Sequence, residues 1–464
     1  MGDDVRVISL REAVELNPKP DRSMLTDDSE VSFVPMAAVE AASGRMDPST
    51  IRHYAEVKKG YTHFRNGDVL FAKITPCMEN GKMAVAHSLR NGVGLGSTEF
   101  HVLRAREGVD PHYVYHFVSS GHYRSEAAHH MTGAVGQKRV PLAFLEQSQI
   151  PLPELDEQRR IVAEIEKQFS RLDKAVAGLQ LVKANLKRHK AAILNAAVEG
   201  RLVPTEADLA RREGRSYETG AQLLHRILET RRSQWQGKGK HKEPAAPNTT
   251  DMPELPEGWV WASIEQLSQL VEYGSSAKTS EDATGIPVLR MGNIVEGELI
   301  LDGLKYLPRK HGEFPKLLLE PGDLLFNRTN SPELVGKTAV FGGASQPYSF
   351  ASYLIRVRVV DGSLPIYVNA YINSMYGRAW VKKVVTQQVG QANVNGTKLQ
   401  ALAIPLPPLP EQHRIVAEVD RRLSIAREAE AEVDANLKRA QGLRQAILAK
   451  AFQPGAVPSA PTFA

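Results

Sequence analysis

The sequence predicts an α+β protein in which two mixed α/β domains are tandem-duplicated and separated by two long helices. Three observations predict this fold. A motif recurs at a constant offset, and apolar residues recur every seven positions after each copy of it. The other segments contain short β-type runs between Gly and Pro turns. A chain of 464 residues has room for two or three domains, each with its own core.

The repeated motif is IPLPELDEQRRIVAEI at 150–165 and IPLPPLPEQHRIVAEV at 404–419, an offset of 404 − 150 = 254 residues. Of the 17 residue pairs that begin at Ile150 and Ile404, 12 are identical. With one residue of slippage, NGDVLFAK (66–73) also matches PGDLLFNR (321–328). Chance does not produce such agreement, so the chain is interpreted as a duplication.

A long helix is expected after each copy of the motif. The first is expected to begin near Glu157, with Asp156 as its N-cap, and would be about 64 Å long at ~1.5 Å per residue. Its heptad spacing is typical of a coiled coil, so we expect the two helices to pack on each other. The alternative is that each helix covers only its own domain. The residues expected in the seam are Ile165, Leu172, Leu179, Leu186, Ile193, Val419, Val433, Leu437 and Ile447.

Composition shifts place the boundaries between the segments. A helical pattern at 220–236 precedes a linker rich in Gly, Lys and Pro, and the residues after Phe452 are expected to be disordered. The expected segments are a first domain (1–156, head 1), a first long helix (157–200), a helix and basic linker (201–253), a second domain (254–410, head 2), a second long helix (411–453) and a tail (454–464).

Charge and motif content limit the possible functions. The net charge is 58 − 53 = +5, and residues 183–243 hold 14 basic against 7 acidic side chains. That local surplus fits either a solvated helix and linker or a nucleic-acid contact. The sequence has no phosphate-binding glycine loop, no paired metal ligands and no methyltransferase motif, so no catalysis is expected. The lone Cys77, the acidic start and the absence of a long apolar run suggest a cytoplasmic protein outside the membrane.

The repeated motif, the ELPEGWVWASIEQL stretch that opens head 2, and the paired GDVLFAK and GDLLFNR motifs resemble the specificity subunit of type I restriction-modification systems. The resemblance covers nearly the whole chain. It implies two target recognition domains and two antiparallel conserved helices that form a coiled coil with pseudo-twofold symmetry. Each domain would recognise one half of a split, asymmetric DNA sequence, and the helices would set the gap.

The resemblance also implies partners. Two modification subunits would dock on the conserved helical regions with S-adenosylmethionine and carry out adenine N6 methylation. Two restriction subunits would add ATP- and Mg-dependent translocation and cleavage. This chain would bind double-stranded DNA, no membrane, no metal and no cofactor of its own, and would have no catalytic residues.

Candidate DNA contacts lie in loops that align between the two heads. Lys, Arg, Asn, Gln and Thr side chains can recognise base edges, although Asn, Gly and Thr also favour ordinary turns. The candidates are Lys73, Thr75, Asn80, Lys82, Gln137, Lys138, Arg139, Asn327, Arg328, Thr329, Asn330, Lys337, Gln391, Asn393, Asn395 and Lys398. The rival hypotheses are a protein-binding scaffold with two heads and a self-contained nuclease or methyltransferase, which the missing motifs disfavour.

Overall fold

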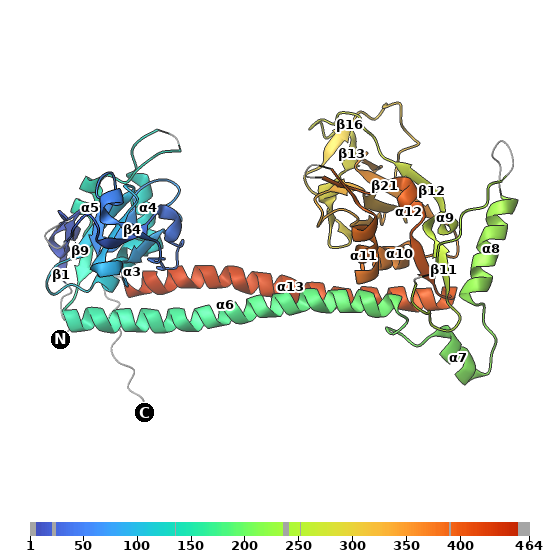
Figure 1. The fold of residues 1–464 in the computed structure, drawn as a ribbon, viewed down its shortest axis with the longest axis horizontal. Coiled ribbons are helices and arrows are strands. Elements are labelled where there is room, and N and C mark those ends of the chain that lie inside the picture. The colour runs from blue at the N-terminus through green and yellow to red at the C-terminus, as the bar shows by residue number, and fades with distance from the viewer. Residues whose placement is uncertain are drawn as a thin grey trace. The chain divides into compact units, whose positions relative to one another are not determined.

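The computed structural model describes residues 6–20, 25–134, 136–234, 241–250, 252–388 and 391–452. The tail expected to be disordered (454–464) lies outside them. The chain forms two compact units, one made of Met1–Leu181 and Val433–Ala464 and the other of Val182–Glu432 (Figure 1). Each unit holds one head together with one half of each long helix.

Head 1 combines two four-stranded sheets with a two-stranded ribbon. Its strands are β1 (Arg6–Ser9), β2 (Val14–Leu16), β3 (Glu30–Val34), β4 (Ile51–His53), β5 (Thr62–Arg65), β6 (Val69–Ala72), β7 (Met83–Val85), β8 (Val93–Gly96), β9 (Phe100–Ala105) and β10 (Gln149–Leu152). Its helices are α1 (Leu10–Ala13), α2 (Tyr54–Val57), α3 (Pro111–Ser119), α4 (Gly121–His129) and α5 (Leu142–Gln147), with 3-10 turns η1 (Met36–Ala38) and η2 (Arg90–Gly92). The sheets have the orders β2-β9-β6-β7 and β4-β3-β8-β5, and β1 pairs with β10.

Head 2 repeats most of these elements and contains additional short strands. Its strands are β11 (Val260–Ser263), β12 (Ser268–Tyr273), β13 (Ile286–Leu289), β14 (Ile294–Val295), β15 (Glu298–Leu299), β16 (Lys305–Leu307), β17 (Leu324–Asn327), β18 (Thr329–Asn330), β19 (Thr338–Val340), β20 (Ser349–Phe350), β21 (Leu354–Val359), β22 (Thr386–Gln388), β23 (Gln391–Asn393) and β24 (Ala403–Leu406). Its helices are α9 (Ile264–Leu267), α10 (Pro365–Asn373), α11 (Met375–Val384) and α12 (Gly396–Gln400), with one 3-10 turn, η3 (Met291–Asn293).

The duplication expected from the sequence is present in the fold. The sheet β12-β21-β17-β19 has the same order as β2-β9-β6-β7, and the parallel pair β13 and β20 matches β3 and β8. The ribbons agree residue by residue, because Arg6 lies opposite Leu152 in head 1 and Val260 opposite Leu406 in head 2. The predicted α+β fold is confirmed.

Local chemistry explains where α3 begins. Asp110 accepts hydrogen bonds from the amides of His112 (2.8 Å) and Tyr113 (3.2 Å), and Pro111 occupies the first helical position. A proline is tolerated there because the amide hydrogen that it lacks would have no partner within the helix. α3 then buries one side against the apolar core of head 1, which also contains Leu10, Phe71 and Met83.

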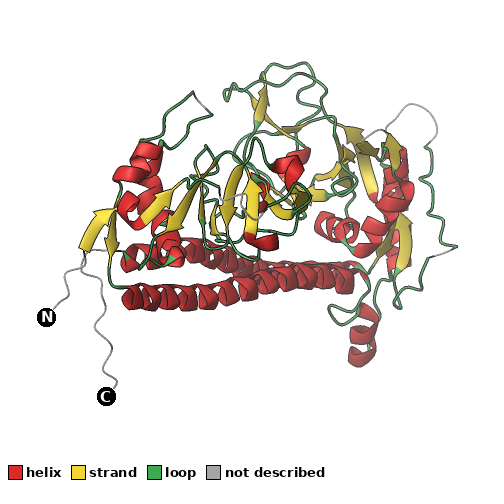
Figure 2. Ribbon diagram, turned by 60° about the vertical axis from the view of Figure 1, so that its left-hand side comes forward, coloured by secondary structure: helices red, strands yellow, loops and turns green. Residues whose placement is uncertain are grey.

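The two long helices are α6 (Leu155–Val198) and α13 (Leu409–Ala451). They lie side by side and antiparallel within each unit (Figure 1, Figure 2). In the first unit, Ile165 and Phe169 of α6 pack with Leu448 of α13. In the second, Ile193 packs in one cluster with Ile415 and Val419. The antiparallel coiled-coil pair is therefore confirmed.

The seam residues differ in burial. Ile165, Ile193, Val419 and Val433 are buried, whereas Leu172, Leu179, Leu186, Leu437 and Ile447 are half-buried. Their individual contacts across the seam stay a prediction, apart from the two clusters around Ile165 and Ile193. The expected N-cap was wrong, because α6 begins at Leu155 and Asp156 lies in its first turn.

The repeated EQ dipeptide connects each helix to its head. Gln158 accepts a hydrogen bond from the amide of Asp110 (2.9 Å) and donates to the carbonyl of Gly108 (3.0 Å). Gln412 makes the same contacts with the amide of Leu364 (3.0 Å) and the carbonyl of Gly362 (3.3 Å). Because both glutamine side chains are buried, this part of the repeat maintains the fold.

The segment between the halves forms α7 (Glu206–Glu213) and α8 (Gly220–Ser233). Leu223 and Ile227 of α8 are buried in the core of head 2. Much of the basic surplus is paired, for example Arg211 with Glu257 (2.6 Å) and Arg226 with Glu218 (2.7 Å). These pairs favour the interpretation of this segment as a solvated, ion-paired surface.

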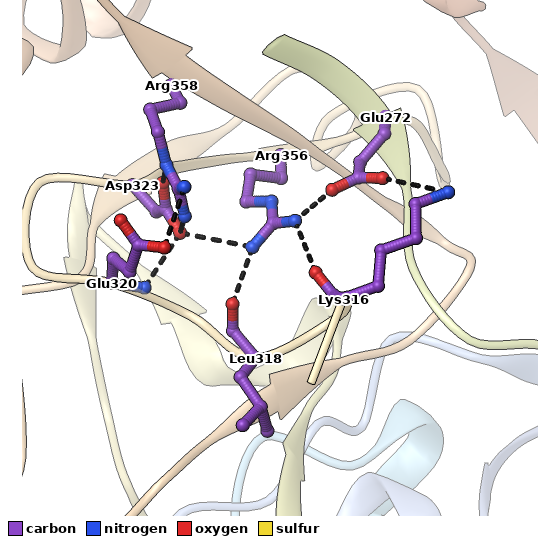
Figure 3. Close-up of polar contacts among 7 residues, drawn as sticks. All are labelled: Glu272, Lys316, Leu318, Glu320, Asp323, Arg356 and Arg358. Carbon is purple, nitrogen blue, oxygen red and sulfur yellow. Dashed lines mark hydrogen bonds and ion pairs between the residues drawn. The ribbon is translucent and has the colours of Figure 1, made fainter. Parts of the chain in front are cut away.

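A buried arginine distinguishes head 2 from head 1. Arg356 and Arg358 lie two residues apart on β21 and converge on the buried carboxylate of Asp323 (Figure 3). The Arg356 side chain also pairs with Glu272 and donates to the carbonyls of Leu318 (2.6 Å) and Lys316 (2.9 Å). In head 1, the equivalent pair is Asp68 with Arg104 (2.8 Å), and Val102 takes the position of Arg356. Burial lowers the pKa of Arg356 to about 10, so this side chain remains charged at neutral pH.

His116 of α3 is buried against Phe169 and Tyr115. Neither ring nitrogen has a hydrogen-bond partner among the described residues. Burial, with smaller contributions from His112 and Arg444, lowers the pKa of His116 to about 3. The unfolded chain therefore takes up a proton below the ordinary histidine pKa of ~6.5, whereas the folded chain does not until near pH 3.

We predict that His116→Leu weakens the acid sensitivity of the protein. Folding stability should fall by about 1.4 kcal/mol per pH unit below pH 6.5 for this group alone, or about 2 kcal/mol from pH 7.5 to pH 5. Urea midpoints at the two pH values should therefore differ less in the variant than in the wild type. His122→Leu on exposed α4 is the control and should keep the wild-type dependence. Equal pH dependence in all three proteins would contradict a neutral, buried His116.

Candidate nucleic-acid interface

In head 2, two loops far apart in sequence form one small sheet. β18 follows the end of β17 and pairs with β23, which pairs in turn with β22. Thr329 lies opposite Asn393, and the side-chain amide of Asn393 donates to the Thr329 hydroxyl (2.8 Å). The amide of Val394 donates to the carbonyl of Arg328 (2.9 Å). The structure therefore brings together the 327–337 and 391–398 candidate loops. We call the place where these two loops meet the junction of head 2.

Head 1 has the same junction at equivalent positions. Isolated β-bridges join Ile74 to Arg139 and Thr132 to Arg139. The amide of Val140 donates to the carbonyl of Lys73 (2.8 Å), as Val394 does to Arg328 in head 2. Because the same backbone scaffold presents different side chains, the two junctions offer different surfaces to a ligand.

A positively charged side chain lies at the centre of each junction. In head 2, the guanidinium of Arg328 stacks 4.7 Å from the ring centroid of Tyr273 and donates to the carbonyl of Ser352 (3.4 Å). Its Nε atom has no hydrogen-bond partner among the described residues. In head 1, Lys73 occupies the equivalent position and lines a groove of about 500 Å³ together with Lys58, Lys59 and Tyr61. Such basic, partly aromatic surfaces suit phosphate and base contacts.

The candidate residues differ in how free their side chains are. Asn80, Gln137, Lys138, Arg139 and Asn395 are exposed; Lys73, Thr75, Lys82, Arg328, Asn330, Lys337, Asn393 and Lys398 are half-buried; Asn327 and Thr329 are buried. The side chain of Gln391 lies outside the described residues. Among the candidates whose side chains are described, the structure therefore encloses only Asn327 and Thr329, which support the junction from within.

Several candidates have partners within the protein. Lys82 donates to the carbonyl of Met36 (3.0 Å), and Lys398 donates to the Val384 carbonyl (2.7 Å) and the Thr386 hydroxyl (2.8 Å). Asn395 caps α12 by accepting from the amide of Lys398 (2.9 Å). These contacts are compatible with an ordinary structural role.

Arg139 forms a two-point contact with Glu99 (2.8 and 2.9 Å). Its hydrogen bond lowers the pKa of the Glu99 carboxyl. The position equivalent to Glu99 in head 2 is Tyr353, half of whose surface is exposed. An ion pair therefore borders the junction of head 1, whereas an aromatic ring borders the junction of head 2.

The aromatic residues of this surface were not among the predicted DNA contacts. Tyr273 and Tyr353 flank the junction of head 2, and Tyr61 lies in the groove of head 1. The Lys58-Lys59-Gly60-Tyr61 run was a usable signal, because it joins basic and aromatic residues. Tyr273 carried no such signal, since it reaches Arg328 only through the pairing of β12 with β21.

These observations define a duplicated protein with two unlike junctions on equivalent scaffolds. A family model described as "Type I restriction modification DNA specificity domain" matches residues 2–178 and 256–435. The chain belongs to this family, and each match covers one of the duplicated halves. It is a specificity subunit of the type I restriction-modification class, with a role in DNA recognition and no catalytic activity.

Known relatives agree with this assignment. The Escherichia coli type I restriction enzyme EcoAI specificity subunit is 28% identical over 467 aligned residues, 89% of this chain and 76% of the relative. A solved structure described as "complex assembly and conformational transition of the type I R-M system" is 21% identical over 97% of this chain and 98% of its own, with a TM-score of 0.67. The HsdS subunit of Thermoanaerobacter tengcongensis is 23% identical over 98% of both chains, with a TM-score of 0.55. The two structures share the fold.

Among the residues that the structure describes, no helix is both long and apolar enough to cross a bilayer. No group of three or more His, Cys, Asp or Glu side chains in the same residues has the geometry to hold a metal ion.

Proposed function

We propose that the chain recognises a split, asymmetric DNA target, with one half-site bound by each head. The observation that supports this most directly is that equivalent loops meet at equivalent residues in both heads, while their side chains differ. Joining two modest binding sites in one molecule multiplies their effective affinities, provided that both can engage at once.

We also propose a role for the individual side chains. Lys73, Gln137 and Lys138 in head 1, and Arg328, Asn330 and Lys337 in head 2, have surface available for DNA. Thr75, Asn80, Lys82, Arg139, Gln391, Asn393, Asn395 and Lys398 border them, and Asn327 and Thr329 hold the loops in place from within. Phosphate contacts determine orientation and base contacts determine sequence, so the central cations Lys73 and Arg328 are the strongest candidates for specificity.

The partners belong to the same proposal. Two modification subunits would dock on the conserved helical regions, supplying S-adenosylmethionine and adenine N6 methylation, and two restriction subunits would supply ATP- and Mg-dependent cleavage. The repeated motif supports this arrangement, because it places nearly the same residues at the start of both long helices. Two identical partners could then bind two similar surfaces. The cytoplasmic location stays a prediction.

The segment boundaries become functional assignments in this proposal. Residues 1–156 and 254–410 are the recognition domains, 157–200 and 411–453 are the helices that set the gap, 201–253 is the connection and 454–464 is a tail. The helices would act as a spacer because the heptad pattern of apolar residues extends over many turns of each helix.

Exchange of one head tests the proposal. Residues 254–404 are replaced with the corresponding segment of the EcoAI specificity subunit, and the hybrid is purified with its modification subunits. Duplexes that it retains from a random library are then sequenced. We expect one half-site to change and the other to stay as in the parent. A hybrid that changes both half-sites, or neither, would contradict the assignment of one half-site to each head.

A further inference from the structure

A short turn connects head 2 to the long helices. β14 and β15 form a hairpin whose two central residues are Glu296 and Gly297, with φ of 49° and 90°. Such a turn needs positive φ at both positions, where Asn, Asp and Gly are favoured. A glutamate there is unusual. Its longer side chain reaches Lys190 of α6, with a distance of 2.8 Å between Glu296 Oε2 and Lys190 Nζ. We call residues 296–298 the acidic turn.

The acidic turn makes a second ion pair with the helices. Glu298 pairs with Arg427 of α13, and Lys190 also pairs with Glu430 of α13. The Lys190 side chain is 16% exposed and that of Arg427 38% exposed, so solvent screens these pairs only in part. The hydrogen bond from Lys190 lowers the pKa of the Glu296 carboxyl. The turn is therefore connected to both helices at once.

The acidic turn is also connected to the recognition loop of head 2. The carbonyl of Gly297 accepts from Asn369 of α10 (3.1 Å), and the Thr338 hydroxyl donates to the Asn369 side-chain oxygen (2.7 Å). Thr338 begins β19, directly after the candidate residue Lys337. A displacement of the turn on the helices would therefore move the loop that carries Lys337.

Head 1 has an equivalent turn with the opposite charges. Gly44 has φ of 76° and lies against Tyr115, the position equivalent to Asn369. The next residue, Arg45, faces Asp173 of α6 (3.9 Å), which pairs with Arg444 of α13 (2.9 Å). Asp173 + 254 is Arg427, so the helix position that is acidic in the first unit is basic in the second. Each turn therefore complements its own end of the helix pair and would be repelled by the other.

We propose that the Glu298–Arg427 and Glu296–Lys190 pairs are positioning contacts that set the orientation of head 2 on the helices, and through it the gap accepted between half-sites. The inference rests on the proposed function, because a gap exists only if the two heads bind two half-sites. Like charges at these positions should loosen the orientation of head 2 while leaving every side chain of its DNA-binding junction unchanged.

The test uses the full chain with its modification subunits and a random duplex library. The variants are Glu298→Arg, Arg427→Asp and the double variant Glu298→Arg with Arg427→Asp, which recreates the polarity of Arg45 and Asp173. Asp302→Arg is the matched control, because Asp302 is an exposed carboxylate just after β15 and its substitution changes the charge by the same amount as Glu298→Arg. For each protein, the lengths of the gap in the retained duplexes are counted.

We expect Glu298→Arg to keep both half-sites. The number of retained duplexes with the preferred gap length, divided by the number with neighbouring gap lengths, should fall by roughly three- to ten-fold. The double variant should restore most of that ratio, and Asp302→Arg should match the wild type. If the wild type selects no split motif, the proposed function fails and the inference with it. If the wild type selects one and Glu298→Arg keeps the wild-type gap, the inference alone fails. Loss of a half-site that the double variant does not restore would likewise overturn it, because the pair would then maintain the fold of head 2.

Discussion

Asp323→Ala should destabilise head 2 by about 3 to 5 kcal/mol, the typical cost of removing one partner from a buried ion pair. Asp323 is fully buried and receives both arms of Arg358 (2.7 and 2.8 Å) and one of Arg356 (3.3 Å). Its carboxylate also accepts from the amide of Glu320 (2.8 Å). Without it, two guanidinium groups lose a counter-charge, and Arg356, which is 2% exposed, cannot turn to solvent.

Asp68→Ala provides the comparison in head 1. Asp68 is equally buried but neutralises only Arg104, whose side chain is 19% exposed and can reach water. The loss of stability should therefore be smaller than for Asp323→Ala. Urea unfolding monitored by limited proteolysis would measure the stability of both variants. Early cleavage inside 254–404 is expected for Asp323→Ala alone. Equal midpoints for the two variants would show that Arg356 adds nothing to the cost.

Arg328→Ala should weaken binding to one half-site by about 5- to 150-fold, which corresponds to the ~1–3 kcal/mol of a good two-point base contact. Arg328 lies at the junction of the two loops of head 2, is oriented by Tyr273, and has an Nε atom with no protein partner among the described residues. The measurement is competition binding by the full chain with its modification subunits, using duplexes altered in one half-site at a time.

Two variants separate base recognition from simple charge. Arg328→Lys keeps the charge but loses the planar fork, so it should still lose discrimination at that half-site. Lys73→Ala, at the equivalent position of head 1, should affect only the other half-site. Uniform weakening on all duplexes, including random ones, would instead identify Arg328 as a phosphate contact.

Periodic features of the chain were predictable from sequence. The offset of 254 predicted the duplication, and the heptads predicted α6 and α13 because an amphipathic helix needs only local spacing. Runs such as DVLFAKI and DLLFNRT predicted β6 and β17. The alignment of the halves also selected loops that converge in both heads, since each loop follows a strand with an equivalent partner.

Features that depend on contacts between distant segments were not predictable. Burial of Arg356 requires Glu272 to approach it from β12 and Asp323 from the turn before β17, and a charged residue in a strand gives no sign of this. The enclosure of Thr329 arises from the pairing with β23, and that of Asn327 from its pairing with β21 and its backbone contacts with Gly336 and Lys337. The acidic turn was missed for the same reason, because Glu298 gains its role from Arg427, 129 positions further along the chain (427 − 298).

We propose above all that two duplicated heads recognise two unlike half-sites held at a constant separation. The most direct measurement is the sequence of the duplexes that the unaltered chain, with its modification subunits, retains from a random pool. We expect two short, different motifs separated by a gap of one length with no base preference. A single uninterrupted motif, two identical motifs or no enrichment at all would contradict it.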